Sequence, residues 1–310
     1  MALPSFVLIR SKTDIFATGD HKTHPVITPD NTDTPKPLLI FSPQEAGEYP
    51  VIVLLHGFLL YNTFYSQLSH HIASHGYILV APQLYLWTGL DATNEIEDAA
   101  KITNWLQEGL QKYLPYQVNA DLTNVALAGH SRGGKVAFAL ALNALDAKIN
   151  LKFSALIGID PVDGLNGGIQ TTPKVLTNIP NSFNLKMPVM VIGSGLGEVG
   201  TICMGTFGAC APKGVNHEEF YNECRKPACY FVVKDYGHLD MLDDETKGIR
   251  GKFTYCMCKD GEAREPMRKF VGGAVVACLK AYLGGDYSYL TSIKDNEDSP
   301  VVLQDVDYRL

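Results

Sequence analysis

The sequence lacks the features that mark repeat proteins, nucleic-acid-binding proteins and membrane-spanning proteins. Its 310 residues contain no internal repeat, no low-complexity segment and no block of Lys or Arg, and the net charge is -7. The absence of a basic block argues against nucleic acid as a partner. No apolar run reaches the roughly 20 residues that a membrane-spanning helix needs. With 46% hydrophobic and 19% charged residues, the composition is that of an ordinary globular chain.

The N-terminus lacks the signature of a targeting peptide. Its first ten residues include a short apolar segment, but no basic region and no clear cleavage site precede or follow it. Asp14 and Asp20 also differ from the acid-poor composition of a transit peptide. No leader is therefore recognisable from the residues themselves.

Cysteines are absent from the first two hundred residues. All seven lie between Cys203 and Cys278, and an odd number leaves at least one free thiol. The spacings Cys224-x4-Cys229 and Cys256-x-Cys258 do not give the paired C-x2-C arrangement of a structural zinc site. We expect reduced thiols or one or two local disulfides, with no metal and no cofactor.

Apolar runs of strand length alternate with segments of helical period along the chain. Such alternation, in strands without polar faces, is typical of one α/β domain whose mostly parallel sheet is flanked by helices. The expected strands lie at residues 5–10, 37–41, 49–55, 77–82, from 124, 153–160, 187–193 and 228–233; the expected helices lie at 64–74, 95–114, from the turn near 131 to about 145, and 267–282.

We expect this domain to occupy residues 1–310. A Gly- and Cys-rich insert at about 194–227 lies between two expected strands, a place where insertions often form a lid over an active site. The segment from about 284 is acidic, and we expect a loosely held C-terminal tail.

The segment Gly129-His-Ser131-Arg-Gly133 lies between an apolar strand and an Ala/Leu-rich helix. It matches the G-x-S-x-G pattern of a nucleophile elbow, in which glycines flank the serine because a Cβ there would clash with the strand or helix. The pattern predicts an α/β-hydrolase fold with Ser131 as nucleophile. A Gly-rich turn with a helix-capping serine is the alternative.

A serine nucleophile needs a histidine base, which in this fold follows the serine in the chain. His238 follows the expected strand that ends at Val233, so it is the preferred base. His217 lies inside the insert and is typical of a solvated helix start. His130 is excluded as base because neighbouring side chains on a sharp turn diverge.

The acid that orients this base is less clear from position alone. Asp160 ends an expected strand, from which a carboxylate can reach the imidazole. Asp163 lies in the turn that follows, and Glu198 follows the next strand, where many hydrolases of this fold carry their acid. Position favours Asp160 only modestly.

The remaining site residues are inferred from the loops that follow two strands. An oxyanion needs backbone N–H donors, which we expect from Arg132 and Phe58. Apolar side chains in the same loops are candidates to bind an apolar substrate, although each could equally fill the core: Leu59, Leu60, Tyr61, Leu84 and Trp87.

Seven stretches together resemble the plant chlorophyllase family over nearly the whole chain, and the G-H-S-R-G-G-K form is far more specific than the general elbow: Ile40–Pro50, Ile72–Pro82, Gly129–Lys135, Phe153–Val162, Asn181–Asn184, Val191–Gly197 and Tyr236–Leu242. The resemblance implies hydrolysis of the phytyl ester of chlorophyll to chlorophyllide and phytol. It also implies Ser131 as nucleophile, Asp160 as acid and His238 as base.

The resemblance further implies a chloroplast location. Without a clear transit peptide, the cytosol and the endomembranes or vacuole stay open. Because chlorophyll is insoluble in water, peripheral contact of the protein with a membrane is a further expectation. The alternatives in function are a lipase or general esterase for other long-chain esters and a non-catalytic hydrolase fold that binds a ligand. The last predicts a broken triad, which the sequence does not show.

Overall fold

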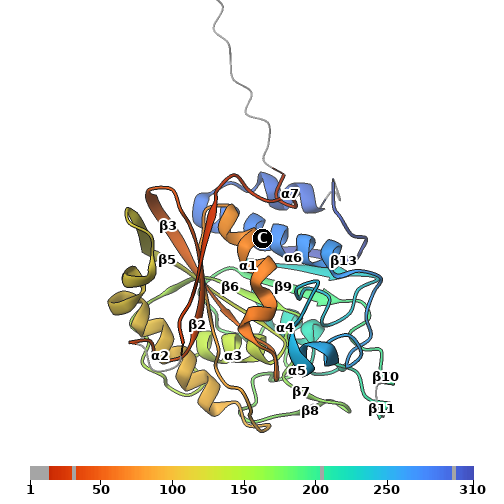
Figure 1. Cartoon of the computed structure of the whole chain (residues 1–310). Helices are drawn as coiled ribbons and strands as arrows, with labels where there is room; N and C mark the ends of the chain where they lie inside the picture. The colour runs from red at the N-terminus through yellow and green to blue at the C-terminus, as the bar shows by residue number, and fades with distance from the viewer. Residues whose placement is uncertain (1–13, 30–32, 203–205, 295–297) are drawn as a thin grey trace, which may run out of the picture.

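The computed structural model describes residues 14–29, 33–202, 206–294 and 298–310. These residues form a nine-stranded sheet in the order β1-β2-β4-β3-β5-β6-β9-β12-β13 (Figure 1). Its strands are β1 (Thr23–Ile27), β2 (Leu38–Pro43), β3 (Gly47–Leu55), β4 (Ile78–Pro82), β5 (Val118–His130), β6 (Phe153–Ile159), β9 (Val189–Ser194), β12 (Ala228–Val233) and β13 (Leu303–Arg309).

The strands from β4 to β12 run parallel, and β1, β2 and β13 pair antiparallel at the two sides. The carboxyl ends of parallel strands meet at one edge of a sheet, where ligands bind in open α/β folds. The loops after β3, β5, β6 and β12 therefore leave from this one edge. The mostly parallel α/β sheet predicted from the sequence is confirmed.

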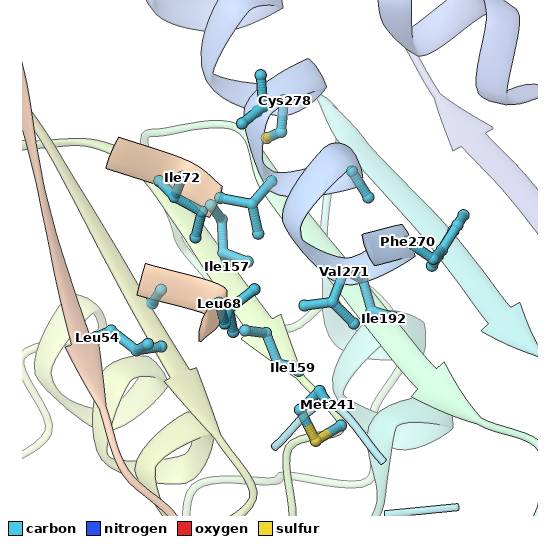
Figure 2. Close-up of a cluster of buried hydrophobic side chains, with 14 of the residues drawn as sticks. Leu54, Leu68, Ile72, Ile157, Ile159, Ile192, Met241, Phe270, Val271 and Cys278 are labelled. Carbon is cyan, nitrogen blue, oxygen red and sulfur yellow. The ribbon is translucent and has the colours of Figure 1, made fainter. Parts of the chain in front are cut away.

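Helices cover both faces of the sheet because its strands are apolar on both sides. Successive residues of β3 alternate between two cores: Ile52 and Leu54 lie in one, Val51 and Val53 in the other. The first core packs under α1 (Ser66–Ser74) and α6 (Arg264–Gly284), with α7 (Ser288–Lys294) beside it. Figure 2 shows this layer, where Leu68 and Ile72 of α1 and Phe270 and Val271 of α6 meet residues of the sheet.

The second core packs against helices on the opposite face. These are α2 (Thr93–Gly109), α3 (Arg132–Ala141) and α4 (His217–Glu223). Short 3-10 turns, η1 (Asn62–Tyr65) and η2 (Leu110–Tyr113), adjoin α1 and α2, and the short α5 (Gly248–Phe253) lies near the sheet's carboxyl edge. The helix after the elbow ends at Ala141, not near 145 as predicted, because Asn143 adopts a left-handed backbone with φ 55.

Two predictions about the chain ends have different outcomes. The expected strand at 5–10 lies outside the described residues. The prediction of a loosely held tail is wrong, because β13 pairs along the length of β12 from Ala228↔Arg309 to Val233↔Leu303. β1 was not expected, since Thr23–Ile27 lies in a polar, turn-rich part of the sequence, and most of its residues are exposed.

The insert after β9 contains short β-hairpin strands β10 (Thr201–Ile202) and β11 (Thr206–Phe207), followed by α4. A second small hairpin, β7 (Gly164–Leu165) with β8 (Ile169–Gln170), follows β6. A disulfide joins Cys210 in the insert to Cys258, 48 residues further along the chain, so this bridge is not a local one. The described free cysteines, Cys224, Cys229 and Cys278, are buried. Among the described helices, none has the length and apolar character to span a membrane.

Candidate active site

Ser131 lies on a sharp turn between β5 and α3. Its backbone has φ 55 and ψ -124, a strained conformation for a residue with a side chain. The flanking glycines are required by close contacts. A Cβ on Gly129 would lie 2.1 Å from the carbonyl oxygen of Gly133, and a Cβ on Gly133 would lie 2.2 Å from that of Leu55. The elbow geometry thus follows directly from the G-x-S-x-G pattern.

The turn brings Ser131 to His238, which lies in the loop after β12. The His238 Nε2 atom lies 2.7 Å from the Ser131 Oγ, and its Nδ1 atom lies 2.7 Å from Oδ2 of Asp160. Asp160 follows β6 directly, and all three side chains are buried. A carboxylate only accepts hydrogen bonds, so Nδ1 carries the proton and Nε2 is free to accept the serine proton.

Further groups hold the Asp160 carboxylate. The Ser194 hydroxyl donates to Oδ2, and the Ser194 N–H donates to Oδ1 at 3.3 Å. The His217 Nε2 lies 3.8 Å from Oδ1. Burial raises the pKa of Asp160, but the hydrogen bond from His238 and the charges of His238 and His217 outweigh it, so the pKa is lowered overall. The carboxylate is therefore ionised when it faces the imidazole.

The alternative acids and base have other contacts. Asp163 forms a buried ion pair with Lys135 at 2.9 Å, and its Oδ2 accepts the backbone N–H groups of Val175 and Leu176. Glu198 accepts from the Asn216 side chain at 2.8 Å. His217 is buried, not solvated as expected, because Gly193 leaves room for its ring: a Cβ there would lie 2.3 Å from Nδ1 of His217.

Two backbone N–H groups near Ser131, those of Arg132 and Phe58, are the expected donors to an oxyanion. Arg132 opens α3, where helical N–H groups have no partner within the helix. Within the described chain, neither the Arg132 nor the Phe58 N–H donates to another protein group. Gly57 lets its loop approach the nucleophile, since a Cβ there would lie 3.2 Å from the Ser131 Cβ.

The carbonyl of Gly57 is held firmly, and this orients the next N–H. It accepts from the Nδ1 of His56 at 2.8 Å, the Tyr85 hydroxyl at 3.3 Å and the Leu60 N–H at 3.2 Å. In a trans peptide the C=O of one residue and the N–H of the next point in opposite directions. The Phe58 N–H is therefore fixed facing away from these three donors.

A cavity of about 180 Å³ opens beside the serine. It is lined by residues of the elbow, of the loops after β3, β4 and β6, and of the insert: Phe58, Leu90, Ser131, Arg132, Lys135, Val162, Gly164, Leu165, Asn166, Thr171, Ala209, Cys210 and Pro212. The insert thus forms one wall of the cavity.

The five apolar residues predicted to bind substrate lie elsewhere. None of them lines this cavity. Leu60 and Leu84 are buried in the two cores, so the prediction for these two is wrong: both point into packed helices and strands. Leu59 and Tyr61 are half-buried, and Trp87 is 78% exposed.

Sequence reasoning missed the role of the Arg132 side chain. Its guanidinium forms a buried ion pair with Glu95 of α2 at 2.6 Å and donates to the carbonyls of Leu90 and Asp91. It also lies over the Phe58 ring, 5.4 Å from the centroid. This side chain ties the loop before α2 to the elbow, and only the three-dimensional contact reveals it.

The sheet order and the elbow define the α/β-hydrolase fold, and the Ser131–His238–Asp160 geometry is that of serine hydrolases within it. Comparison with protein families matches residues 11–310 to chlorophyllase. The chain is 59% identical to chlorophyllase-2 of Arabidopsis thaliana over 285 residues, covering 90% of this chain and 89% of the relative.

Other relatives agree. Chlorophyllase-1 of Arabidopsis thaliana is 50% identical over 88% of this chain and 85% of its own length. A protein of Citrus unshiu named "Chlorophyllase-1, chloroplastic" is 42% identical over 97% of this chain and 91% of its own length. The chain belongs to the chlorophyllase family, and the family resemblance predicted from its motifs is confirmed.

Proposed function

We propose that this chlorophyllase cleaves the phytyl ester of chlorophyll through an acyl-enzyme on Ser131. As a member of its family it hydrolyses chlorophyll to chlorophyllide and phytol. The observation that carries the mechanism is the hydrogen-bonded chain from Ser131 through His238 to Asp160, with both contacts at 2.7 Å.

In the first half-reaction, the Ser131 Oγ attacks the ester carbonyl carbon while its proton passes to Nε2 of His238. The negative oxygen that forms accepts hydrogen bonds from the N–H groups of Phe58 and Arg132. The tetrahedral intermediate collapses as His238 returns the proton to the departing phytol oxygen. Phytol leaves, and the chlorophyllide acyl group stays on Ser131.

In the second half-reaction, water attacks the acyl carbon and His238 takes a proton from it. Collapse of this intermediate returns the proton to the Ser131 Oγ and releases chlorophyllide. Asp160 keeps Nδ1 protonated and stabilises the imidazolium in both halves. The magnesium ion belongs to the substrate, and no step requires another metal.

The test compares the wild-type protein with Ser131→Ala. A fluorophosphonate probe should label the wild-type protein on Ser131, and the variant should neither be labelled nor release phytol above background. Purified variant with wild-type phytol release would refute the acyl-enzyme mechanism.

We propose that the protein also contacts a lipid surface through an apolar rim beside the cavity, formed by Phe58, Leu86, Trp87, Leu90 and Ile249. Trp87 and Ile249 are 78% and 79% exposed, and Phe58 and Leu90 also line the cavity. Arg250, next to Ile249, lies 4.8 Å from the Trp87 ring centroid, which brings α5 beside the loop after β4. A lipid-embedded phytyl ester would enter from this side.

Vesicle binding tests this contact. Trp87→Ser should reduce sedimentation with phosphatidylcholine vesicles and slow hydrolysis of chlorophyll in those vesicles, but not hydrolysis of a water-soluble ester. Tyr116→Ser is the matched control, because Tyr116 is 91% exposed and precedes β5, at the opposite edge of the sheet. Equal binding by the wild-type protein and Trp87→Ser would contradict the proposal.

We also propose a chloroplast location, supported by the word "chloroplastic" in the names of two Citrus relatives. Immunoblotting of isolated chloroplasts against cytosolic and vacuolar fractions tests it. A signal confined to the other fractions would exclude this location.

A further inference from the structure

Two buried polar side chains beside Ser131 have no part in the mechanism above. His130 is the last residue of β5 and immediately precedes the nucleophile, and it is 0% exposed. Tyr65 ends η1 and is 1% exposed. A buried polar side chain is retained only where its hydrogen bonds are satisfied, so the partners of these two residues indicate what they do.

The partners of His130 define its tautomer. Its Nε2 lies 2.8 Å from the main-chain carbonyl oxygen of His238. A carbonyl only accepts, so Nε2 carries the proton. Burial lowers the pKa of His130 to about 3, which leaves the ring neutral and makes Nδ1 an acceptor. His130 therefore donates to the backbone of the base and cannot itself serve as the base for Ser131.

Tyr65 completes the connection on the other side. Its hydroxyl lies 2.7 Å from Nδ1 of His130, and it accepts the N–H of Gly57 at 3.0 Å. Because Nδ1 is an acceptor, the hydroxyl donates to it. The resulting chain runs from the Gly57 N–H through Tyr65 and His130 to the His238 carbonyl, with each donor and acceptor used once.

We propose that His130 and Tyr65 are positioning residues that fix the main chain of His238 relative to the turn that supplies the Phe58 N–H. One end of the chain holds the backbone that carries the imidazole. The other end holds Gly57, whose carbonyl orients that N–H. The two segments follow β12 and β3, which are far apart in the sequence. The buried hydrogen bonds through Tyr65 and His130 join them.

This chain of hydrogen bonds affects the rate of the catalytic step and not the binding of substrate. Neither His130 nor Tyr65 lines the cavity. Displacement of a reacting group by about 1 Å can lower a rate about 100-fold, whereas loss of a group outside the cavity leaves substrate contacts intact. We therefore expect kcat to fall while KM stays near its wild-type value.

The experiment compares His130→Asn with His130→Gln. An Asn amide oxygen falls near the Nδ1 position and can accept from Tyr65, but Asn has no donor near His238. The longer Gln places its amide nitrogen near the Nε2 position and keeps the donor. We expect about a 100-fold fall in kcat for Asn and recovery to within about 10-fold of wild type for Gln. KM should stay within about twofold of wild type for both.

Tyr65→Phe tests the hydrogen bonds between Gly57, Tyr65 and His130. It also serves as the test if the His130→Asn variant does not fold. It removes the hydroxyl and should lower kcat about 10-fold without changing KM. Thermal melting checks that each variant is folded. Wild-type kcat in His130→Asn or Tyr65→Phe would overturn the proposal, and so would equal losses in Asn and Gln, which would show a packing role.

A measurement on the wild-type protein needs no variant. In ¹⁵N-edited NMR of histidine side chains, His130 should give the neutral tautomer protonated at Nε2 from pH 5 to 9. A tautomer protonated at Nδ1 would overturn the proposal. The inference rests on the proposed catalytic role of Ser131, and Ser131→Ala assayed in parallel separates the two: activity in Ser131→Ala defeats the mechanism, whereas full activity in the His130 and Tyr65 variants defeats only the positioning role.

Discussion

Replacement of Asp160 by Asn should abolish most activity through a change of histidine tautomer. The Ser194 N–H donates to Oδ1 of Asp160 and cannot accept, so an Asn side chain should place its carbonyl oxygen there. Its NH2 group then occupies the Oδ2 position, 2.7 Å from Nδ1 of His238. Facing a donor, Nδ1 must lose its proton, and the proton moves to Nε2. That nitrogen can no longer accept the proton of Ser131.

The expected loss in kcat is about 10⁴-fold, the size seen when a serine hydrolase base is held in the wrong tautomer. This corresponds to about 5 kcal/mol of transition-state stabilisation. An assay that measures phytol release by chromatography, in reactions run for several hours, can detect a rate that is about 10⁴-fold lower. The Ser131 variant supplies the background rate.

The other two acids that sequence position leaves open serve as controls. Glu198→Gln should keep near wild-type kcat, because Glu198 contacts Asn216 and not the imidazole. Asp163→Asn leaves the buried Lys135 without its charged partner and should destabilise the protein by about 3–5 kcal/mol. The Asp163→Asn protein that remains folded should still hydrolyse chlorophyll. Activity within about 10-fold of wild type in Asp160→Asn, or a comparable loss in Glu198→Gln, would refute this reasoning.

Two further predictions concern the stability of the loops around the site. Replacing Cys210 and Cys258 together by Ala should lower the free energy of unfolding by about 2–4 kcal/mol in urea titrations, because the disulfide restricts the unfolded chain. Because Cys210 lines the cavity, chlorophyll hydrolysis should fall more than hydrolysis of a small ester, and equal losses on both substrates would contradict this. Burial and the nearby charge of Asp240 raise the pKa of Asp260 to about 6, so the cost of its ionisation to folding grows between about pH 4 and pH 6 and is complete above pH 6. Asp260→Asn should therefore raise the melting temperature at pH 8, with a gain that shrinks as the pH falls from 6 towards 4; a gain independent of pH would show another cause.

The sequence predicts the centre of this fold better than its margins. Buried parallel strands have no polar face, so runs such as 49–55 and 77–82 are recognisable without knowledge of their neighbours. The elbow is equally local, because the clashes that require Gly129 and Gly133 arise within one strand–turn–helix unit. β13 was missed because an edge strand alternates apolar and polar residues, and the acidic residues of Leu303–Arg309 resemble those of a solvated tail.

Contacts between distant segments explain the other misses. Asp160, Asp163 and Glu198 all follow strands at the same edge of the sheet, and only the path of each side chain separates them. His217 has the sequence context of an exposed helix start, yet it packs beside Asp160 because Gly193, on another strand, leaves space for its ring. Leu60 and Leu84 flank the site in sequence but turn into the core. Apolar character alone does not distinguish these directions.

The pairing of β13 with β12 has a practical consequence for handling the protein. β12 is an uncharged strand, Ala-Cys-Tyr-Phe-Val-Val, and without β13 its N–H and C=O groups would form an open sheet edge. Open apolar edges of this kind recruit strands from other molecules. A truncation that removes residues from 303 onward should therefore yield oligomers or inclusion bodies. An affinity tag fused after Leu310 needs a flexible spacer, so that β13 can still pair with β12.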